Sequence, residues 1–250
     1  MKIFKNFNIS QKYKNSAIAI GNFDGFHLGH QKVIKKGKDI ANKKKLKFGL
    51  LVFHPLPVMF FNKKLKNFRI DSLEQKINTS RNLGIDFLII KKFDRNFSRT
   101  SAIKFITHIL HIKLKAKLIF ISKNFKFGKN RNGDIKLLKK NEDLHNYETK
   151  TIPPFKKKNK IISSTLIRKN IKKGKINLAN KMLGRYWTIE GLVKRGKKLG
   201  RKIGFPTCNL NLENYIVPKA GVYSSIVVVN KKIKKKGIVN IGYKPTFGKN

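Results

Sequence analysis

Short apolar runs alternate with amphipathic stretches through the first two thirds of the chain. Four runs consist almost entirely of Ile, Leu, Val, Phe and Ala, which is typical of strands buried on both faces. Between them, apolar residues recur with the spacing of a helix that packs one face on a core. The predicted strands are residues 17–20, 48–53, 87–90 and 117–121, and the predicted helices are 31–41, 73–83 and 102–112. This alternation predicts right-handed βαβ crossovers and a parallel, Rossmann-like α/β sheet.

The pattern changes after Gly184. A helical stretch over residues 166–183 closes the first part, and short β-rich segments punctuated by Gly and Pro follow it. These segments cover residues 187–193, 221–229 and 232–241, and they predict a small antiparallel barrel or sandwich. We therefore expect two domains, residues 1–183 and residues 184–250.

Composition limits the location and the redox chemistry of the chain. Its 250 residues are 40% hydrophobic, contain no apolar run of 18 residues, and begin with Lys and Asn mixed among Phe and Ile rather than with a signal-peptide core. We expect a cytoplasmic protein without a membrane partner. The single cysteine, Cys208, excludes an intrachain disulfide and a cysteine-based zinc site, and we predict that it is a small buried filler.

The net charge of +47, from 59 Lys and Arg against 12 Asp and Glu, would ordinarily indicate nucleic acid or an anionic membrane. The basic residues, however, are scattered from end to end among abundant Asn and Ile, as an AT-biased coding sequence would produce. No known nucleic-acid-binding motif accompanies them. We expect no specific nucleic-acid partner, and only salt-sensitive, non-specific binding as a side effect.

The loop after the first predicted strand carries the strongest chemical signal. Residues 21–30 read Gly-Asn-Phe-Asp-Gly-Phe-His-Leu-Gly-His, and a predicted helix follows. Glycines allow a sharp bend and close approach of a ligand, and a helix N-terminus attracts phosphate. His27 and His30 add donors for a polyphosphate. The alternative is a Rossmann-like turn whose histidines only cap the helix.

Two further loops follow predicted strands. The first contains Phe-His-Pro-Leu-Pro over residues 53–57, with Phe60 and Phe61 just beyond it; taken alone, that pair of rings indicates core more often than ligand contact. The other reads Ser-Lys-Asn-Phe-Lys-Phe-Gly over residues 122–128. The spacing from there to Gly133 superficially suggests a P-loop, but Asp and Ile stand where Lys and Ser or Thr are required.

A fourth segment, Ile-Ser-Ser-Thr-Leu-Ile-Arg over residues 162–168, places hydroxyls at a predicted helix start and an arginine one turn later. A capping box and a surface charge would explain these residues without a ligand. An arginine fork also suits a phosphate, because it donates two parallel hydrogen bonds.

Together the four segments resemble the bacterial bifunctional riboflavin kinase/FAD synthetases, whose adenylyltransferase half has an HxGH-type turn. The resemblance implies transfer of AMP from ATP to FMN, giving FAD and pyrophosphate, with Mg²⁺ on the triphosphate. It implies three catalytic residues, His27, His30 and Arg168. The implied ATP-binding residues are Gly21, Asn22, Phe23, Asp24, Gly25, Gly29, Ser163, Ser164 and Thr165, and the implied flavin-binding residues are Phe53, His54, Pro55, Phe60, Asn124 and Phe127.

The C-terminal part resembles the riboflavin kinase module in residues 196–209, 221–223 and 240–247. The resemblance implies ATP and Mg²⁺ binding by Gly200, Arg201, Gly204, Pro206, Thr207 and Asn209, with Thr207 and Asn209 as the Mg²⁺ ligands. Family kinases also use a carboxylate base farther downstream, whereas this sequence has no Asp or Glu after Glu213. We therefore expect an incomplete barrel without kinase activity here, although the parent protein would phosphorylate riboflavin to FMN.

Two residue types leave alternatives open. His108 and His111 have the i, i+3 spacing of a helical metal site, but no third ligand is evident. Asp24 either orients the turn through backbone amides or lies near a metal. The sequence gives no indication of the oligomeric state.

Overall fold

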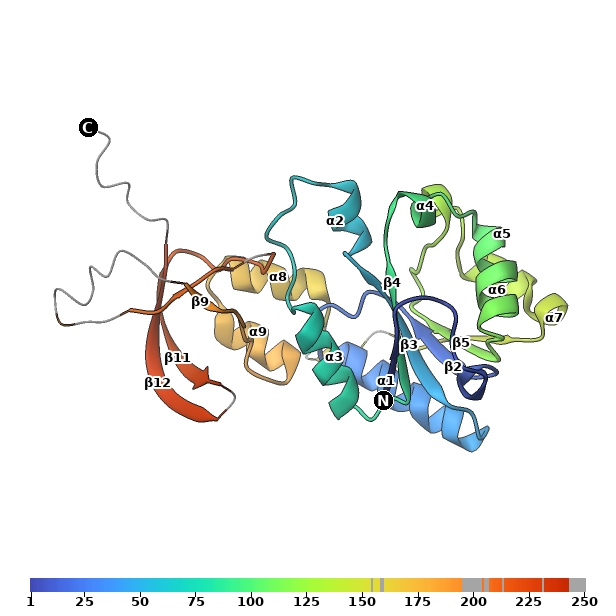
Figure 1. The fold of residues 1–250 in the computed structure, drawn as a ribbon, viewed down its shortest axis with the longest axis horizontal. Helices are drawn as coiled ribbons and strands as arrows, with labels where there is room; N and C mark the ends of the chain where they lie inside the picture. Colours follow the sequence, from blue (N-terminus) through green and yellow to red (C-terminus); the bar gives the residue numbers. More distant parts are fainter. Residues whose placement is uncertain are drawn as a thin grey trace.

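A six-stranded parallel sheet forms the body of the first domain (Figure 1). The computed structural model describes residues 1–153, 155–157, 160–194, 204, 207–212, 214–230 and 232–242. The strand order in the sheet is β1-β4-β3-β2-β5-β6, and every neighbouring pair is parallel. The strands are β1 (Lys2–Phe4), β2 (Ala17–Ile20), β3 (Phe48–His54), β4 (Phe87–Lys92), β5 (Leu118–Ile121) and β6 (Glu148–Thr151). The predicted parallel α/β fold is confirmed.

Helices cover both faces of this sheet, as Figure 1 shows. The larger ones are α1 (Leu28–Lys43), α3 (Leu73–Asn82) and the π-helix η2 (Phe105–Lys113), which continues α5 (Ala102–Lys104). Shorter helices are α2 (Pro57–Phe61), α4 (Arg95–Ser98), α6 (Ile135–Lys140) and α7 (Glu142–His145), with the 3-10 turns η1 (Gln11–Tyr13) and η3 (Lys129–Arg131). The three predicted helices are therefore present, and α1 starts three residues earlier than predicted.

Successive strand residues point to opposite faces, and each face builds its own core. Ile18 and Ile20 of β2 pack with Phe105 and Ile109 of the α5–η2 side. Their neighbours in the strand, Ala17 and Ala19, belong to the cluster on the α1 and α3 side. Burial of both faces explains why the central strands are continuous apolar runs rather than alternating patterns.

Two helices, α8 (Ser164–Lys172) and α9 (Ile176–Leu183), follow the sheet domain. The prediction of one helical stretch over 166–183 is wrong in this detail, because Gly174 ends the first helix with a φ of +72°, a conformation that suits glycine. The short pair β7 (Lys156–Lys157) and β8 (Lys160–Ile161) precedes them.

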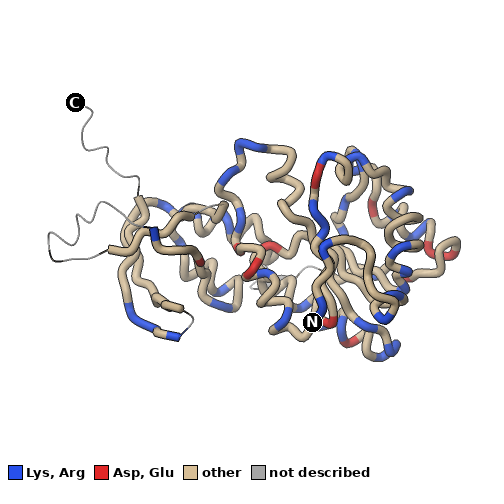
Figure 2. Tube along the Cα trace, viewed as in Figure 1, with Lys and Arg blue, Asp and Glu red and all other residues tan. Residues whose placement is uncertain are grey.

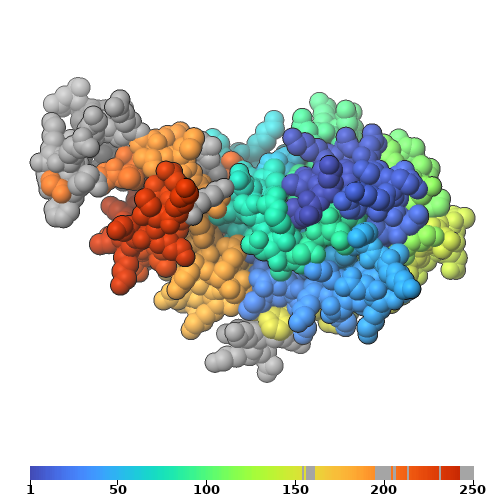
Figure 3. Space-filling model, turned by 60° about the horizontal axis from the view of Figure 1, so that its bottom comes forward, coloured from blue at the N-terminus to red at the C-terminus, as the bar shows by residue number. Residues whose placement is uncertain are grey.

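The C-terminal part has antiparallel strands, as predicted. The strands β9 (Val193–Lys194) and β10 (Asn209–Leu210) form one pair, and β11 (Gly221–Val229) and β12 (Ile233–Ile241) form a long hairpin. Figure 3 shows this hairpin, in red, at the molecular surface beside the light-orange residues of α8 and α9. Within the described residues these are two-stranded sheets, so closure into a barrel is not seen there.

Two sequence predictions in this part are wrong. Residues 187–192 do not form a strand, because Trp187 is held instead by hydrogen bonds from its backbone N–H to Asn180 and from its indole N–H to Ile70. Cys208 is exposed rather than buried, because it precedes β10, whose two residues pair only with the equally exposed β9 within the described chain.

A third apolar cluster joins the two parts of the chain. Ile70, from the segment before α3, and Ile216, from the C-terminal part, both have no exposed surface and pack with α8 and α9. A parallel bridge between Arg69 and Tyr215 accompanies this packing. The boundary near residue 184 stays a prediction, and the chain on its C-terminal side contributes to the core beside α8.

Candidate active site

The predicted site loops meet at one edge of the sheet. The strands β2, β3 and β5 are parallel neighbours, so the loops that follow them leave from the same, carboxyl edge. The chain builds outward from β2 to β3 and β4, and then returns to place β5 on the other side of β2. Ligands of open α/β sheets bind in the crevice created by such a reversal.

The turn after β2 is held in an unusual backbone conformation. Phe23 and Phe26 have φ values of +43° and +38°, which side-chain-bearing residues rarely adopt. Both rings are buried and stack with centroids 5.7 Å apart. A Cβ on Gly25, whose φ is +87°, would lie 3.0 Å from Ile70 and 3.2 Å from Leu183. Glycine is thus required where the turn packs against the third cluster.

The two histidines lie together at the start of α1. Nδ1 of His27 accepts a hydrogen bond from the backbone N–H of His30 at 3.3 Å, so His27 is the N-cap of α1. The two rings stack with their centroids 3.7 Å apart. Because Nδ1 is the acceptor, the proton of neutral His27 is on Nε2, which remains a donor. His27 therefore caps the helix, and its Nε2–H remains available to donate to a ligand.

Both imidazoles are strongly disposed to stay neutral. The pKa of His27 is lowered from its ordinary 6.5 to about 4, mainly by burial; Asp24 opposes this shift and Arg168 adds to it. Burial also lowers the pKa of His30 well below its ordinary value, with His27, Lys76 and Arg168 adding to the effect. Without a bound anion, the site presents imidazole N–H dipoles rather than imidazolium charges.

Asp24 is buried and fully engaged by partners outside its own turn. Its carboxylate accepts the backbone N–H of Ile70 at 3.2 Å and that of Asp71 at 3.4 Å. It also forms an ion pair with Arg168, with Nη2 and Oδ2 2.5 Å apart. Arg168 in addition donates Nε–H to the carbonyl of Phe68 at 3.0 Å and covers that ring at 3.8 Å. Asp24 thus orients the segment before α3 and the arginine, rather than its own turn.

The hydroxyl-bearing segment lies directly against the turn. Ser164 Oγ donates to the carbonyl of Asp24 at 2.8 Å, which joins residues 140 positions apart in sequence. Ser163 caps α8 by accepting the N–H of Leu166 at 3.3 Å. Thr165 is exposed and lines an open depression of about 420 Å³. The other lining residues are Leu65, Phe68, Arg168, Lys169, Lys172 and Lys173, four of them cationic.

Aromatic rings gather at the carboxyl ends of β3 and β4. Phe53 is buried, with its centroid 6.0 Å from Phe93 and 5.7 Å from Phe97. Phe60, on α2, lies 5.3 Å from Phe93, and Phe61 is 69% exposed. Phe61 is therefore not a core residue, although its residue type alone indicates one. The sequence analysis did not identify Phe93, which directly follows β4, or Phe97, which lies on α4.

The turn from β3 into α2 contains the remaining residues predicted to contact flavin there. His54 and Pro55 are half-buried and are joined by a cis peptide bond. Burial, with Arg69 and Lys76 nearby, lowers the pKa of His54 below its ordinary value.

The loop after β5 divides its predicted flavin residues between surface and core. Asn124 is exposed, whereas Phe127 is 7% exposed and packs on Phe105 with centroids 5.2 Å apart. Close packing explains the glycines that follow, because a Cβ on Gly128 would lie 2.6 Å from the backbone of Ala102. Phe127 supports the loop from beneath, and Asn124 is free to face a ligand.

The predicted kinase residues are only partly within the described chain. Gly204 and Thr207 are exposed, and Asn209 pairs with Lys194 where β10 meets β9. Gly200, Arg201 and Pro206 lie outside the described residues. The predicted kinase role of this group stays a prediction.

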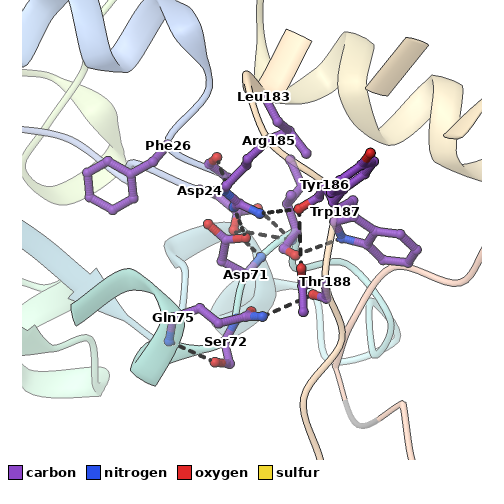
Figure 4. Close-up of polar contacts among 12 residues, drawn as sticks. Asp24, Phe26, Asp71, Ser72, Gln75, Leu183, Arg185, Tyr186, Trp187 and Thr188 are labelled. Atoms are coloured by element: carbon purple, nitrogen blue, oxygen red, sulfur yellow. Dashed lines mark hydrogen bonds and ion pairs between the residues drawn. The ribbon is translucent and has the colours of Figure 1, made fainter. Parts of the chain in front are cut away.

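A polar network at the junction includes residues that the sequence analysis missed (Figure 4). Arg185 forms an ion pair with Asp71, with Nη2 and Oδ1 2.5 Å apart, and also donates to the carbonyl of Gly25 at 3.3 Å. Gln75 donates to the carbonyl of Thr188 at 3.0 Å. Lys76, likewise missed, donates to the carbonyl of Asn22 at 2.6 Å. Acidic residues are scarce in this chain, so Asp24 and Asp71 could have drawn attention to this network from the sequence alone. Lys76 could not, because it is one lysine among many.

Metal-ligating side chains do not cluster in the described part of the chain: no group of three His, Cys, Asp or Glu could hold an ion there. The ring centroid of His111, which shares its helix with His108, lies 4.8 Å from that of His145. At the turn, the carboxylate of Asp24 is already paired with an arginine. This donor set does not fit a protein-held Mg²⁺, which favours free carboxylates and phosphate oxygens.

A parallel sheet with a histidine-bearing turn beside the helix that carries Ser164 and Arg168 is the arrangement of an α/β domain of the nucleotidyltransferase type. A family model described as FAD synthetase matches residues 9–166, and one described as riboflavin kinase matches residues 183–250. The chain belongs to the family of bifunctional riboflavin kinase/FMN adenylyltransferases.

Relatives with that name span nearly the whole chain. The protein from Buchnera aphidicola subsp. Schizaphis graminum is 42% identical over 249 residues, which cover 99% of this chain and 80% of the relative. The protein from Bacillus subtilis is 40% identical over 243 residues, covering 96% of this chain and 75% of the relative.

A crystal structure of a protein from Streptococcus pneumoniae, named as a macrolide-efflux protein, has a similar fold. Its TM-score is 0.84 at 27% identity, over 98% of this chain and 80% of that one. In the described part of the present chain, no helix is both long and apolar enough to span a membrane.

Proposed function

We propose that this chain catalyses the transfer of AMP from ATP to the phosphate of FMN, forming FAD and releasing pyrophosphate. The contact between Ser164 and the carbonyl of Asp24 supports this most directly, because it brings the histidine turn and the start of α8 to one place. Family membership supports the identity of both substrates.

The reaction needs alignment and charge stabilisation rather than a covalent enzyme intermediate. A phosphate oxygen of FMN attacks the α-phosphorus of ATP, and the bond from that phosphorus to the bridging oxygen breaks as pyrophosphate leaves. The N–H dipole at Nε2 of His27, together with His30, would stabilise the negative charge that moves to the leaving group. A neutral imidazole performs this task without having to release a proton.

Arg168 would act from the other side of the same crevice. Arg168 is one of the residues that line the cationic depression, together with Thr165. Its pairing with Asp24 fixes its orientation before a ligand arrives, which lowers the entropic cost of binding a phosphate. Asp24 would then contribute to ATP binding indirectly, through this arginine.

Mg²⁺ would enter the site with the triphosphate, since no free carboxylate is available at the turn. Bound there, it would neutralise the phosphate charge. The flavin ring would lie against the aromatic cluster at the ends of β3 and β4, where Phe60 and the exposed Phe61 offer flat faces. Asn124 would supply a polar contact from the loop after β5.

Two parallel incubations of the purified chain with ATP and Mg²⁺ test the proposal, one with FMN and one with riboflavin, each analysed by chromatography. We expect FAD in the FMN incubation. Absence of FAD there would refute the adenylyltransferase assignment, provided that circular dichroism shows a folded chain. The prediction that these 250 residues do not phosphorylate riboflavin stays a prediction, and FMN or FAD from riboflavin would refute it.

Two other assignments are weaker. A different phosphate monoester as acceptor would leave flavin fluorescence unchanged on titration with protein, whereas we expect quenching by the aromatic cluster. A nucleic-acid-binding role has only the charge in its favour, and Figure 2 shows Lys and Arg spread along the whole trace. The predicted cytoplasmic location is part of the same proposal, since ATP and flavin nucleotides are cytoplasmic substrates.

A further inference from the structure

Lys76 is a charged side chain in the protein interior. It lies on α3, where only 5% of its surface is exposed, and its ammonium donates to the carbonyl of Asn22 at 2.6 Å. Burying an ammonium is costly unless it is hydrogen-bonded and near compensating charge. The contacts of the Lys76 ammonium must therefore offset the cost of burying it.

The surrounding charges keep the ammonium in this place. Two carboxylates, Asp24 and Asp71, favour its charged form, whereas Arg69 and Arg168 oppose it. Burial has the largest effect and lowers the pKa of Lys76 below its ordinary value of 10.5. Each carboxylate is already paired with an arginine, so the direct contact that the lysine makes is to the backbone of the turn.

The contact fixes one peptide unit of the glycine-rich turn. A trans peptide is planar, with C=O and N–H pointing in opposite directions. When the carbonyl of Asn22 points at Lys76, the N–H of Phe23 must point away from it. Without the lysine, this peptide could rotate, and a carbonyl dipole turned toward the crevice would repel a triphosphate.

We propose that Lys76 is a positioning residue for adenylyl transfer, which holds the Asn22–Phe23 peptide so that its N–H, not its carbonyl, is available to the phosphates of the nucleotide. The inference rests on the proposed function. Lys76 acts through the turn and needs no contact with substrate. The neighbouring ring of His30, 5.1 Å from that of Phe23, would be held by the same contact.

Three variants test this role. Lys76→Met removes the charge and the donor at similar length, and Lys76→Gln keeps a neutral donor. Lys38→Met is the matched control, because Lys38 also donates to a backbone carbonyl, that of Leu83 at 2.8 Å, away from the site. Positioning errors of about 1 Å typically cost about 100-fold in rate.

We expect Lys76→Met to lower kcat for FAD formation about 100-fold, Lys76→Gln to retain a rate within about tenfold of wild type, and Lys38→Met to retain the wild-type rate. The inference would be overturned if Lys76→Met stayed within about threefold of wild type, if Lys76→Gln lost as much as Lys76→Met, or if Lys38→Met lost as much as either.

A second readout separates positioning from loss of stability. His27, on the turn, Lys76, on α3, and Arg168, on α8, all face His30 and lower its pKa. Removing the lysine charge should therefore raise the pKa of His30, which nitrogen NMR of the histidines measures directly. An unchanged titration of His30 in folded Lys76→Met would contradict the proximity on which the inference depends.

Hydrogen exchange keeps this test independent of the proposed function. If wild-type protein formed no FAD, the adenylyltransferase assignment would fail, while the role of Lys76 would still be decided by exchange of the amides of residues 21–25. We expect at least tenfold faster exchange in Lys76→Met than in Lys38→Met. Equal exchange would overturn the inference. If Lys76→Met did not fold, Lys76→Gln would be compared with Lys38→Met in the same way.

Discussion

The central strands of the sheet and the β11–β12 hairpin are built from similar residues in different surroundings. Leu50 of β3 and Ile18 of β2 have no exposed surface, because helices cover both faces of the sheet. Val222 and Ile238 of the hairpin are 70% and 78% exposed. Apolar β-residues therefore predict a strand, but the packing partner determines whether that strand is buried.

The same contrast separates the two sets of predicted site residues. The adenylyltransferase residues are held by buried contacts from several elements, as Asp24 is held by the segment before α3 and by α8. The described residues of the predicted kinase site, Gly204, Thr207 and Asn209, are exposed. Preorganised donors are what phosphoryl chemistry requires, so we expect the first region to carry the adenylyltransferase activity.

The largest expected effect is on catalysis in the sheet domain. His27→Ala or His30→Ala should lower the rate of FAD formation about 100- to 1000-fold, as loss of one donor to a developing charge typically does. Thr207→Ala, in the other region, should leave that rate unchanged. Steady-state assays with FMN and ATP measure both. A loss below about fivefold in both histidine variants would remove them from the mechanism.

The ion pair at the junction of the two regions should matter more than one at the surface. Arg185→Met removes the ion-pair partner of the Asp71 carboxylate. Burial already raises the pKa of that carboxyl group. We expect a loss of about 3 kcal/mol in the free energy of unfolding, measured with urea. The control is Lys44→Met, which breaks the exposed pair with Glu148 and should cost less than about 1 kcal/mol. Equal costs would contradict a buried junction.

Truncating one apolar residue in each region tests whether the central strands are buried and the hairpin is exposed. Leu50→Ala, in β3, should destabilise the protein by about 3 kcal/mol, because it leaves a cavity in the core. Val228→Ala, at a hairpin position that is 51% exposed, should cost less than about 1 kcal/mol. Urea midpoints give both values. A similar cost for Val228→Ala would show that the hairpin packs against a partner in solution.

The smallest expected effect is on the pH dependence of stability. The pKa of His27 is about 4 in the folded chain and near 6.5 when unfolded, so the unfolded chain binds more protons between these values. The contribution of His27 to stability should therefore be lost as the pH drops from 6.5 toward 4, by about 2 kcal/mol at pH 5.

The variant His27→Asn provides the control, because Asn is also a good N-cap. It should lose about 2 kcal/mol less than wild type between pH 7 and pH 5 in urea unfolding. The same loss in both proteins would show that His27 is not buried as a neutral imidazole.

Local signals in the sequence were sufficient for most of the first domain. The apolar runs located β2 to β5, and the glycine and histidine spacing located the turn before α1. The edge strand β6 was missed, because it reads Glu-Thr-Lys-Thr and lacks an apolar run. The break between α8 and α9 was missed because the apolar spacing continues across Gly174.

The sequence by itself determined the family, the alternation of central strands and large helices in the first domain, and the loops that leave the carboxyl edge of its sheet, because those depend on local pattern and on motif. Only the tertiary structure showed that Asp24 pairs with Arg168, that Asp71 pairs with Arg185, and that Lys76 holds the carbonyl of Asn22. These contacts join segments far apart along the chain. In a strongly basic sequence, the few charged residues that become buried cannot be told from the exposed ones. Folding removes water from those few, and the energy of each then depends on its partners.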